Sequence, residues 1–379
     1  MTQAPTGLPP ATGAWREADP AGQRRWFTSA DHVRLEGGGT LPGYTLAFET
    51  WGVLNADRSN AVLVLHALTG DSHAAGPAGP GHPSPGWWDG LIGPGKALDP
   101  REHYVVAPNV LGGCQGSTGP ASTAPDGNPY GSRFPAVTIR DTVTVEAALT
   151  EALGIETWAL VLGGSMGGMR ALEWAVSRPR QVRRLLVLAA AARAGADQIA
   201  WARTQTAAIR QDPGWHGGDY HDFPDGSGPH TGLGIARRIA HTTYRSGTEL
   251  DVRFGSTAQG DEDPLRGGRF AVESYLDHHA DKLVRRFDAA SYVVLTEAMN
   301  RHDVFRGRSR DALQRVRAET AVAAVSSDRL FPPAQQHELA RRITGNPARV
   351  IDSPHGHDGF LVETDQVATI VRDLLHRTT

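Results

Sequence analysis

Short apolar segments alternate with amphipathic segments along two stretches of the chain. In the first stretch, apolar runs predict strands at residues 45–54, 61–68, 103–111, 158–163 and 182–190. In the second stretch, they predict strands at 320–328 and 348–353. Strands that are apolar along their whole length are typical of parallel sheets with helices on both faces. The pattern therefore predicts an α/β fold with a mainly parallel sheet.

Amphipathic segments between these strands predict the helices. Residues 141–153 have apolar positions at helical spacing, and we expect Asp141 to be the N-cap of this helix. Further helices are expected directly after Ser165, around 333–343 and from about 363. These helices would cover the two faces of the sheet.

A long polar region, residues 193–312, interrupts this alternation. It contains no confident strand, and it predicts helices at 196–211, 231–244 and 271–287. We interpret it as a helical lid inserted into a core formed by residues 26–192 and 313–379. Residues 1–25 are rich in Ala, Pro, Gly and Thr, and they lack the basic start and apolar core of a signal peptide. We expect them to form a flexible tail.

Composition narrows the classes of function. The chain has 38 basic and 41 acidic residues, a formal net charge of −3 and no long run of one sign. This balance argues against a dedicated nucleic-acid or membrane-surface protein. The single cysteine, Cys114, excludes an internal disulfide and a zinc site built on several cysteines. No apolar run approaches the ~18 residues needed to span a bilayer, so we expect a soluble protein of the cytoplasm without a bound metal.

One short segment between an apolar strand and a helix could carry a nucleophile. Residues 163–167 read GGSMG and fit the G-x-S-x-G elbow, whose glycines permit a tight turn that exposes the Ser165 hydroxyl above a sheet. The following helix N-terminus would favour developing negative charge. An ordinary glycine-rich turn is the alternative, because the five-residue pattern often occurs by chance. The position between strand and helix favours the nucleophile.

A serine hydroxyl is a weak nucleophile without a base, and the base needs an acid that orients it. Asp328 ends one predicted strand, and His355 and His357 lie on a glycine-rich loop after the next. The order Ser165, Asp328, His357 is the order found with this elbow. Spacing alone does not exclude His355 as the base. Asp352 is the competing acid, but it lies within or near the preceding strand.

Acyl transfer also needs hydrogen-bond donors for an oxyanion. One donor is expected to be the backbone N–H of Met166, directly after the serine. The other is expected from the loop at residues 65–70, where Leu68 and its neighbours are the candidates. An ordinary turn that ends at Gly70 is an equally good interpretation of this loop.

A basic amphipathic segment lies within the predicted lid. Residues 236–245 read ARRIAHTTYR. A guanidinium from this segment could bind a substrate carboxylate with two parallel hydrogen bonds. By itself, however, the segment is more typical of a solvated helix face.

Several segments together resemble the homoserine O-acetyltransferases, acyltransferases of methionine biosynthesis with the α/β-hydrolase fold. The similar segments lie between His66 and Glu363 and read HALTGDSHAAG, PNVLGGCQGSTGPAS, GSRFPAVTIRD, GGSMGGMRALEWA, RRIAHTTYRS, RFDAASYVVLTEAMNRHD, SSDRLFPP and GHDGFLVE. The resemblance covers most of the chain and leaves the N-terminal segment unmatched. It implies an α/β-hydrolase fold with a helical lid.

The resemblance also implies a catalytic triad. Ser165 would be the nucleophile, Asp328 the acid and His357 the base, which decides between the two histidines. His355 is a departure, because similar sequences usually carry a tyrosine there. That difference could alter local pH behaviour, but it leaves the triad intact.

Five further residues receive roles from the resemblance. Leu68 and Met166 would donate the two oxyanion N–H groups. Arg237 and Tyr244 would line the amino-acid site. Asp358 would meet the ammonium group of the substrate.

The activity implied by the resemblance is a ping-pong transfer. Ser165 would take the acetyl group from acetyl-CoA, a co-substrate, and pass it to L-homoserine without a resident cofactor. The family forms homodimers through the lid. Alternatives are succinyl-CoA as donor, serine as acceptor, a carboxylesterase with the same triad, or a catalytically inactive binding module. A general esterase would have no reason to carry the set Arg237, Tyr244 and Asp358.

Overall fold

The computed structural model describes residues 7–376 of the chain and has an eight-stranded sheet at its centre. The order of the strands across the sheet is β1-β2-β4-β3-β5-β6-β7-β8. The strands are β1 (Arg25–Arg34), β2 (Thr40–Trp51), β3 (Ala61–Leu65), β4 (Tyr104–Pro108), β5 (Leu160–Gly164), β6 (Arg184–Leu188), β7 (Glu319–Val325) and β8 (Arg349–Ile351). β2 pairs antiparallel with β1 and β4, and the other neighbours pair in parallel. The predicted mainly parallel sheet is confirmed.

Alternate residues of the central strands face two separate apolar layers. In β5, Val161 belongs to one buried cluster, while Leu160 and Leu162 belong to the other. Helices α1 (Ile139–Ala152), α2 (Met166–Ser177) and α8 (Pro333–Thr344) contribute to the first layer, and α10 (Thr364–His376) contributes to the second. Burial on both faces explains why these strands are apolar at every position.

Three details of the predicted elements were wrong. The N-cap of α1 is Thr138, and Asp141 is the third residue of a capping box, because each side chain accepts a hydrogen bond from the other residue's backbone N–H. The edge strand β1 was not predicted, since most of its side chains are exposed or half-buried and its sequence has no apolar run. The apolar runs also extend beyond the paired strands; residues 61–68, for example, form a strand only to Leu65.

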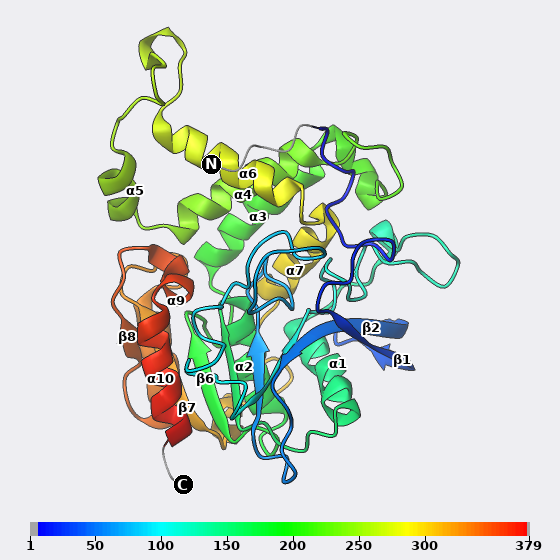
Figure 1. The fold of residues 1–379 in the computed structure, drawn as a ribbon, viewed down its shortest axis with the longest axis vertical. Coiled ribbons are helices and arrows are strands. Elements are labelled where there is room, and N and C mark those ends of the chain that lie inside the picture. Colours follow the sequence, from blue (N-terminus) through cyan, green and yellow to red (C-terminus); the bar gives the residue numbers. More distant parts are fainter. Residues whose placement is uncertain (1–6, 377–379) are drawn as a thin grey trace.

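A group of helices lies between β6 and β7 in the sequence, within residues 193–312. These helices are α3 (Ala196–Arg210), α4 (His230–Tyr244), α5 (Gly247–Phe254), α6 (Ala271–Val284) and α7 (Ala289–Asn300). Figure 1 shows α3 to α6 together on one side of the central sheet. We call residues 193–312 the lid. Shorter helical turns are Gly131–Arg133, Pro213–Gly218, Pro264–Arg266, Ala312–Arg315, Gly356–Asp358 and α9 (Gly359–Val362).

The segment before β1 packs onto the protein. Ala11 and Ala14 are buried, and the Thr12 hydroxyl donates to the buried carboxylate of Asp288 at 2.8 Å. This packing contradicts the flexible tail expected for residues 1–25, of which residues 1–6 lie outside the described part. Small residues without helical or strand periodicity gave no signal of this packing.

None of the helices in residues 7–376 is long and apolar enough to cross a membrane.

Candidate active site

The turn between β5 and α2 places Ser165 in a strained backbone conformation. Its φ of 58° and ψ of −123° lie in a region that residues other than glycine rarely adopt. The turn also brings three backbone segments into close contact. A Cβ on Gly167 would lie 1.9 Å from the carbonyl oxygen of Leu65, and one on Gly163 would lie 2.5 Å from Gly167. The glycines are therefore required, and the tight strand-to-helix turn expected from the sequence is present.

Asp328 and His357 meet after the ends of β7 and β8. The Nδ1 of His357 lies 2.7 Å from Oδ2 of Asp328, and both side chains are buried. The other oxygen of Asp328 accepts hydrogen bonds from the backbone N–H groups of Leu330 and Phe331. These bonds fix the carboxylate, which in turn fixes the imidazole.

The competing histidine and carboxylate lie elsewhere. His355 contacts the guanidinium of Arg245 at 3.4 Å, and Asp352 is exposed and accepts from the Ser326 hydroxyl. Neither lines the cavity that contains Ser165. The structure thus pairs His357, and not His355, with Asp328.

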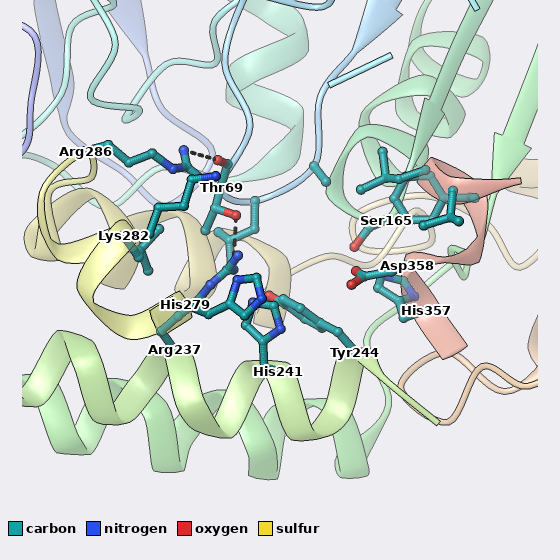
Figure 2. A pocket seen from close by; sticks show the side chains of 16 residues that line it. Thr69, Ser165, Arg237, His241, Tyr244, His279, Lys282, Arg286, His357 and Asp358 are labelled. Carbon is teal, nitrogen blue, oxygen red and sulfur yellow. Dashed lines mark hydrogen bonds between the residues drawn. The ribbon is translucent and has the colours of Figure 1, made fainter. Parts of the chain in front are cut away.

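The environment of His357 suits a general base. Burial lowers its pKa, but the charge and hydrogen bond of Asp328 and the charge of Asp358 outweigh burial, and the net pKa is raised. With Nδ1 donating to Asp328, Nε2 is left as the proton acceptor. Within the described residues, Nε2 has no hydrogen-bond partner. Figure 2 shows His357 next to Ser165.

Ser165 and His357 line a cavity of about 290 Å³ between the core and the lid. Core residues contribute the loop at residues 67–69, and the lid contributes side chains from α4 and α6. Figure 2 shows the lid side chains pointing toward this loop and toward Ser165. The cavity could therefore hold a polar ligand beside the serine.

Arg237 and Tyr244 lie on one face of α4, seven residues apart, and both line the cavity. Nη1 of Arg237 donates to the Thr69 hydroxyl at 3.3 Å, and its guanidinium carbon lies 5.7 Å from the centre of the Tyr244 ring. The Nε of Arg237 is buried without a partner among the described residues. A buried donor without an acceptor is costly, so this arrangement favours an anionic ligand.

Asp358 gives the cavity a negative group beside His357. Burial raises the pKa of Asp358, although the charges of His357 and Arg237 oppose that rise. Its Oδ2 lies 3.4 Å from Nη1 of Arg245, which leaves its other oxygen available to a ligand. Arg237 and Asp358 thus offer opposite charges to one ligand.

The two expected oxyanion donors, Leu68 and Met166, come from different segments of the core. Met166 is the first residue of α2, where a backbone N–H has no acceptor one turn earlier. Leu68 lines the cavity, and the N–H of Gly70 donates to the Ala67 carbonyl, so a tight turn is also present. The turn is therefore present, and the role of Leu68 as an oxyanion donor stays a prediction.

The sequence did not single out several side chains that line this cavity. These are Thr69, His241, His279, Lys282 and Arg286. His241 could have been found, because it follows Arg237 by four residues on the predicted helix. The residues near the end of α6 gave no such signal, since their position depends on how α6 packs on the core.

A second ionisable cluster lies outside this cavity. Glu49, His73 and His82 are buried, and ligand-type atoms of all three lie within 4.8 Å of one another. Nδ1 of His73 donates to Glu49 at 2.9 Å. Nε2 of His82 accepts from the backbone N–H of Gln23 at 3.0 Å. Because both nitrogens are already engaged, we interpret this cluster as a link between the N-terminal segment and β2, not as a metal site.

Comparison with known proteins identifies the class of this molecule. A family profile described as alpha/beta hydrolase fold matches residues 60–364. The solved homoserine O-acetyltransferase from Bacillus anthracis is 28% identical with a TM-score of 0.83, covering 94% of this chain and 98% of that one. Esterase E22 is also 28% identical, with a TM-score of 0.82 and coverage of 93% and 99%. The fold is that of the α/β hydrolases.

A curated relative narrows the class. The homoserine O-acetyltransferase of Thermobifida fusca (strain YX) is 68% identical over 369 residues, which is 97% of each chain. The chain belongs to the homoserine O-acetyltransferase family, and it is an acyltransferase enzyme.

Proposed function

We propose that this enzyme transfers the acetyl group of acetyl-CoA to the side-chain hydroxyl of L-homoserine. The product would be O-acetyl-L-homoserine, for methionine biosynthesis. One observation carries the proposal: Ser165, its candidate base His357, and the opposite charges of Arg237 and Asp358 all line one cavity. An amino-acid alcohol offers a hydroxyl, a carboxylate and an ammonium group that match this set.

In the first half-reaction, His357 takes the proton of the Ser165 hydroxyl as its oxygen attacks the thioester carbonyl. The tetrahedral oxyanion accepts hydrogen bonds from the N–H groups of Leu68 and Met166. The carbon–sulfur bond then breaks, and the leaving sulfur takes the proton from His357. CoA departs, and an acetyl ester remains on Ser165.

In the second half-reaction, the homoserine hydroxyl attacks this ester. His357 takes the hydroxyl proton and returns it to Ser165 as the product leaves. Arg237 would pair with the carboxylate of homoserine and Asp358 with its ammonium group, which aligns the hydroxyl with the ester. Tyr244 packs beside Arg237 and His357 and would shape this site.

These steps use the groups of this chain and a co-substrate, with no resident cofactor or metal. The lid would keep water from the acetyl ester so that a bound alcohol reacts first. We further propose a homodimer formed through the lid and a cytoplasmic location, as the family resemblance implies.

Acetyl-ester hydrolysis is the second candidate function, because esterase E22 shares the fold at a TM-score of 0.82. In a hydrolase, water would discharge the acetyl-enzyme, and the charges of Arg237 and Asp358 would have no ligand to bind. An inactive binding module is disfavoured, since Ser165, Asp328 and His357 are all present.

Release of free CoA can separate these functions. The enzyme should be assayed with acetyl-CoA or succinyl-CoA, each against L-homoserine, L-serine and water. We expect sustained release, beyond one CoA per enzyme, only with acetyl-CoA and homoserine, because this acceptor fits the charge pair and the hydroxyl position. Ser165→Ala should release none.

Equal rates with and without homoserine would make the protein a hydrolase. A preference for succinyl-CoA or for serine would correct the donor or the acceptor while leaving the covalent mechanism in place.

A further inference from the structure

The cavity holds more positive charge than one amino-acid acceptor can pair. Arg237, Lys282 and Arg286 all line it. In the described part of the chain, none of these three forms an ion pair with a carboxylate. Homoserine would bring only one carboxylate to these three cations.

The two arginines are held close together by one loop residue. Nη1 of Arg237 donates to the hydroxyl of Thr69 at 3.3 Å, and Nη1 of Arg286 donates to the Thr69 carbonyl at 3.0 Å. Burial lowers the pKa of Arg286, and the charge of Arg237 lowers it further. The charge of Asp71 opposes this shift. Two adjacent guanidinium groups repel each other, and a bound anion would relieve this repulsion.

Two histidines of the cavity, His241 and His279, do not add to this charge near neutral pH. Burial, followed by the charge of Arg237, lowers the pKa of His241 to about 2 and that of His279 to about 4. Away from His357, the positive field of the cavity therefore comes from the two arginines and Lys282.

The cations lie at different distances from the reacting serine. Figure 2 shows Lys282 and Arg286 on the opposite side of the cavity from Ser165, with Arg237 between them and the serine. Lys282, near the end of α6, is exposed, whereas Arg286 is half-buried. This side of the cavity is therefore open to solvent.

The chemistry of the two substrates assigns the cations. The carboxylate of homoserine is only a few bonds from its reacting hydroxyl, so it can reach Arg237 but not the far side. The phosphates of acetyl-CoA are separated from its thioester by the long pantetheine arm. We propose that Lys282 and Arg286 form a phosphate subsite for the CoA part of the donor; this inference rests on the proposed function.

Acetylation of Ser165 by donors of different length tests this subsite. The rate constant for acetylation should be measured with acetyl-CoA, acetyl-dephospho-CoA and acetyl-pantetheine, which has neither the diphosphate nor the 3′-phosphate. In Lys282→Gln, the ratio of the rate constant for acetyl-CoA to that for acetyl-pantetheine should fall about tenfold, the effect of one lost charge-assisted contact. Lys282→Arg should restore the ratio.

Arg285→Gln is the matched control. It removes the same charge from the same segment, but the Arg285 guanidinium donates to the Gly7 carbonyl and does not line the cavity. Its donor ratio should stay at the original value. Arg286→Gln should lower the ratio as well. Because Arg286 also holds the Thr69 loop, this variant could slow acetylation by every donor, and such a general loss cancels in the ratio to acetyl-pantetheine.

Each donor gives a distinct outcome. If Lys282→Gln slows acetylation by acetyl-dephospho-CoA as much as acetylation by acetyl-CoA, the subsite binds the diphosphate. If the rate constant with acetyl-dephospho-CoA is unchanged in Lys282→Gln, the subsite binds the 3′-phosphate. Equal losses with all three donors, or a loss only in transfer to homoserine, would overturn the subsite. If no donor acetylates the unsubstituted enzyme, the proposed function itself fails, and the subsite fails with it.

Discussion

The side chains of the active site act on one another mainly through charge and hydrogen bonding. Asp328 orients His357 through a direct hydrogen bond, whereas Asp358 influences the same imidazole through its negative charge. Both carboxylates stabilise the protonated imidazole. Together they keep the pKa of His357 above its ordinary value despite burial.

Asp358→Asn should therefore change the pH dependence of Ser165 acetylation. Loss of the negative charge lowers the pKa of His357, and the base is active only when it is neutral. The rise of the acetylation rate with pH should thus move to lower pH. Stopped-flow measurements of CoA release over a pH series would show it.

Asp352→Asn is the control for this change, because Asp352 is an exposed carboxylate on the same loop. It should leave the profile in place. A shift to higher pH in Asp358→Asn, or the same shift in both variants, would contradict the effect assigned to Asp358.

The positions of the triad residues were accessible to sequence analysis for a simple reason. Ser165, Asp328 and His357 each follow a strand, and strand ends meet at one edge of a parallel sheet. Spacing could not choose between His355 and His357, because that choice depends on how the loop turns at Gly356. Its φ is 66°, and a Cβ there would lie 2.5 Å from the Tyr244 carbonyl.

At the scale of elements, α2 is central because its first residue follows the reacting serine. A buried ion pair joins α2 to α1: the guanidinium of Arg170 donates from Nε to Glu146 at 2.9 Å, and the indole of Trp174 donates to the other oxygen at 2.8 Å. Arg170 is 0% exposed and Glu146 is 1% exposed. The carboxylate therefore depends on these two partners.

Arg170→Met should destabilise the protein strongly. The substitution leaves the Glu146 carboxylate buried with only the indole as partner, and breaking a buried pair in this way costs about 3–5 kcal/mol of unfolding free energy. Urea unfolding followed by circular dichroism would measure it. Arg180→Met, at an exposed position after α2, should leave the midpoint unchanged. A similar small change in both variants would show that the pair contributes little.

Most core elements could be predicted because their burial leaves a clear pattern. β5 and β6 are buried at every position, and apart from Arg184 their sequences are runs without polar residues. β1 could not be predicted in this way, since its stability comes from pairing with β2 and its side chains largely face solvent. The cap of α1 was misplaced by three residues, because Thr138 and Asp141 are both suitable cap residues and only the backbone geometry distinguishes them.

In the whole molecule, the cavity lies between the lid and the core, and both parts of the chain line it. The core supplies Ser165, His357 and the loop that contains Thr69, and the lid supplies Arg237 and the cations near the end of α6. The sequence indicated the lid as a break in the strand pattern. It could not indicate Lys282 or Arg286 as cavity residues, because contacts between segments so distant in sequence leave no periodic trace.

If Ser165 carries the acetyl group between the two substrates, the mass of the enzyme must rise by one acetyl group during the reaction. The enzyme should be mixed with acetyl-CoA alone, quenched, and examined by intact-protein and peptide mass spectrometry. We expect one acetyl group on Ser165, which disappears when homoserine is added as O-acetylhomoserine forms, and no acetyl group on Ser165→Ala. Formation of product by an enzyme whose Ser165 is never acetylated would rule out the covalent mechanism.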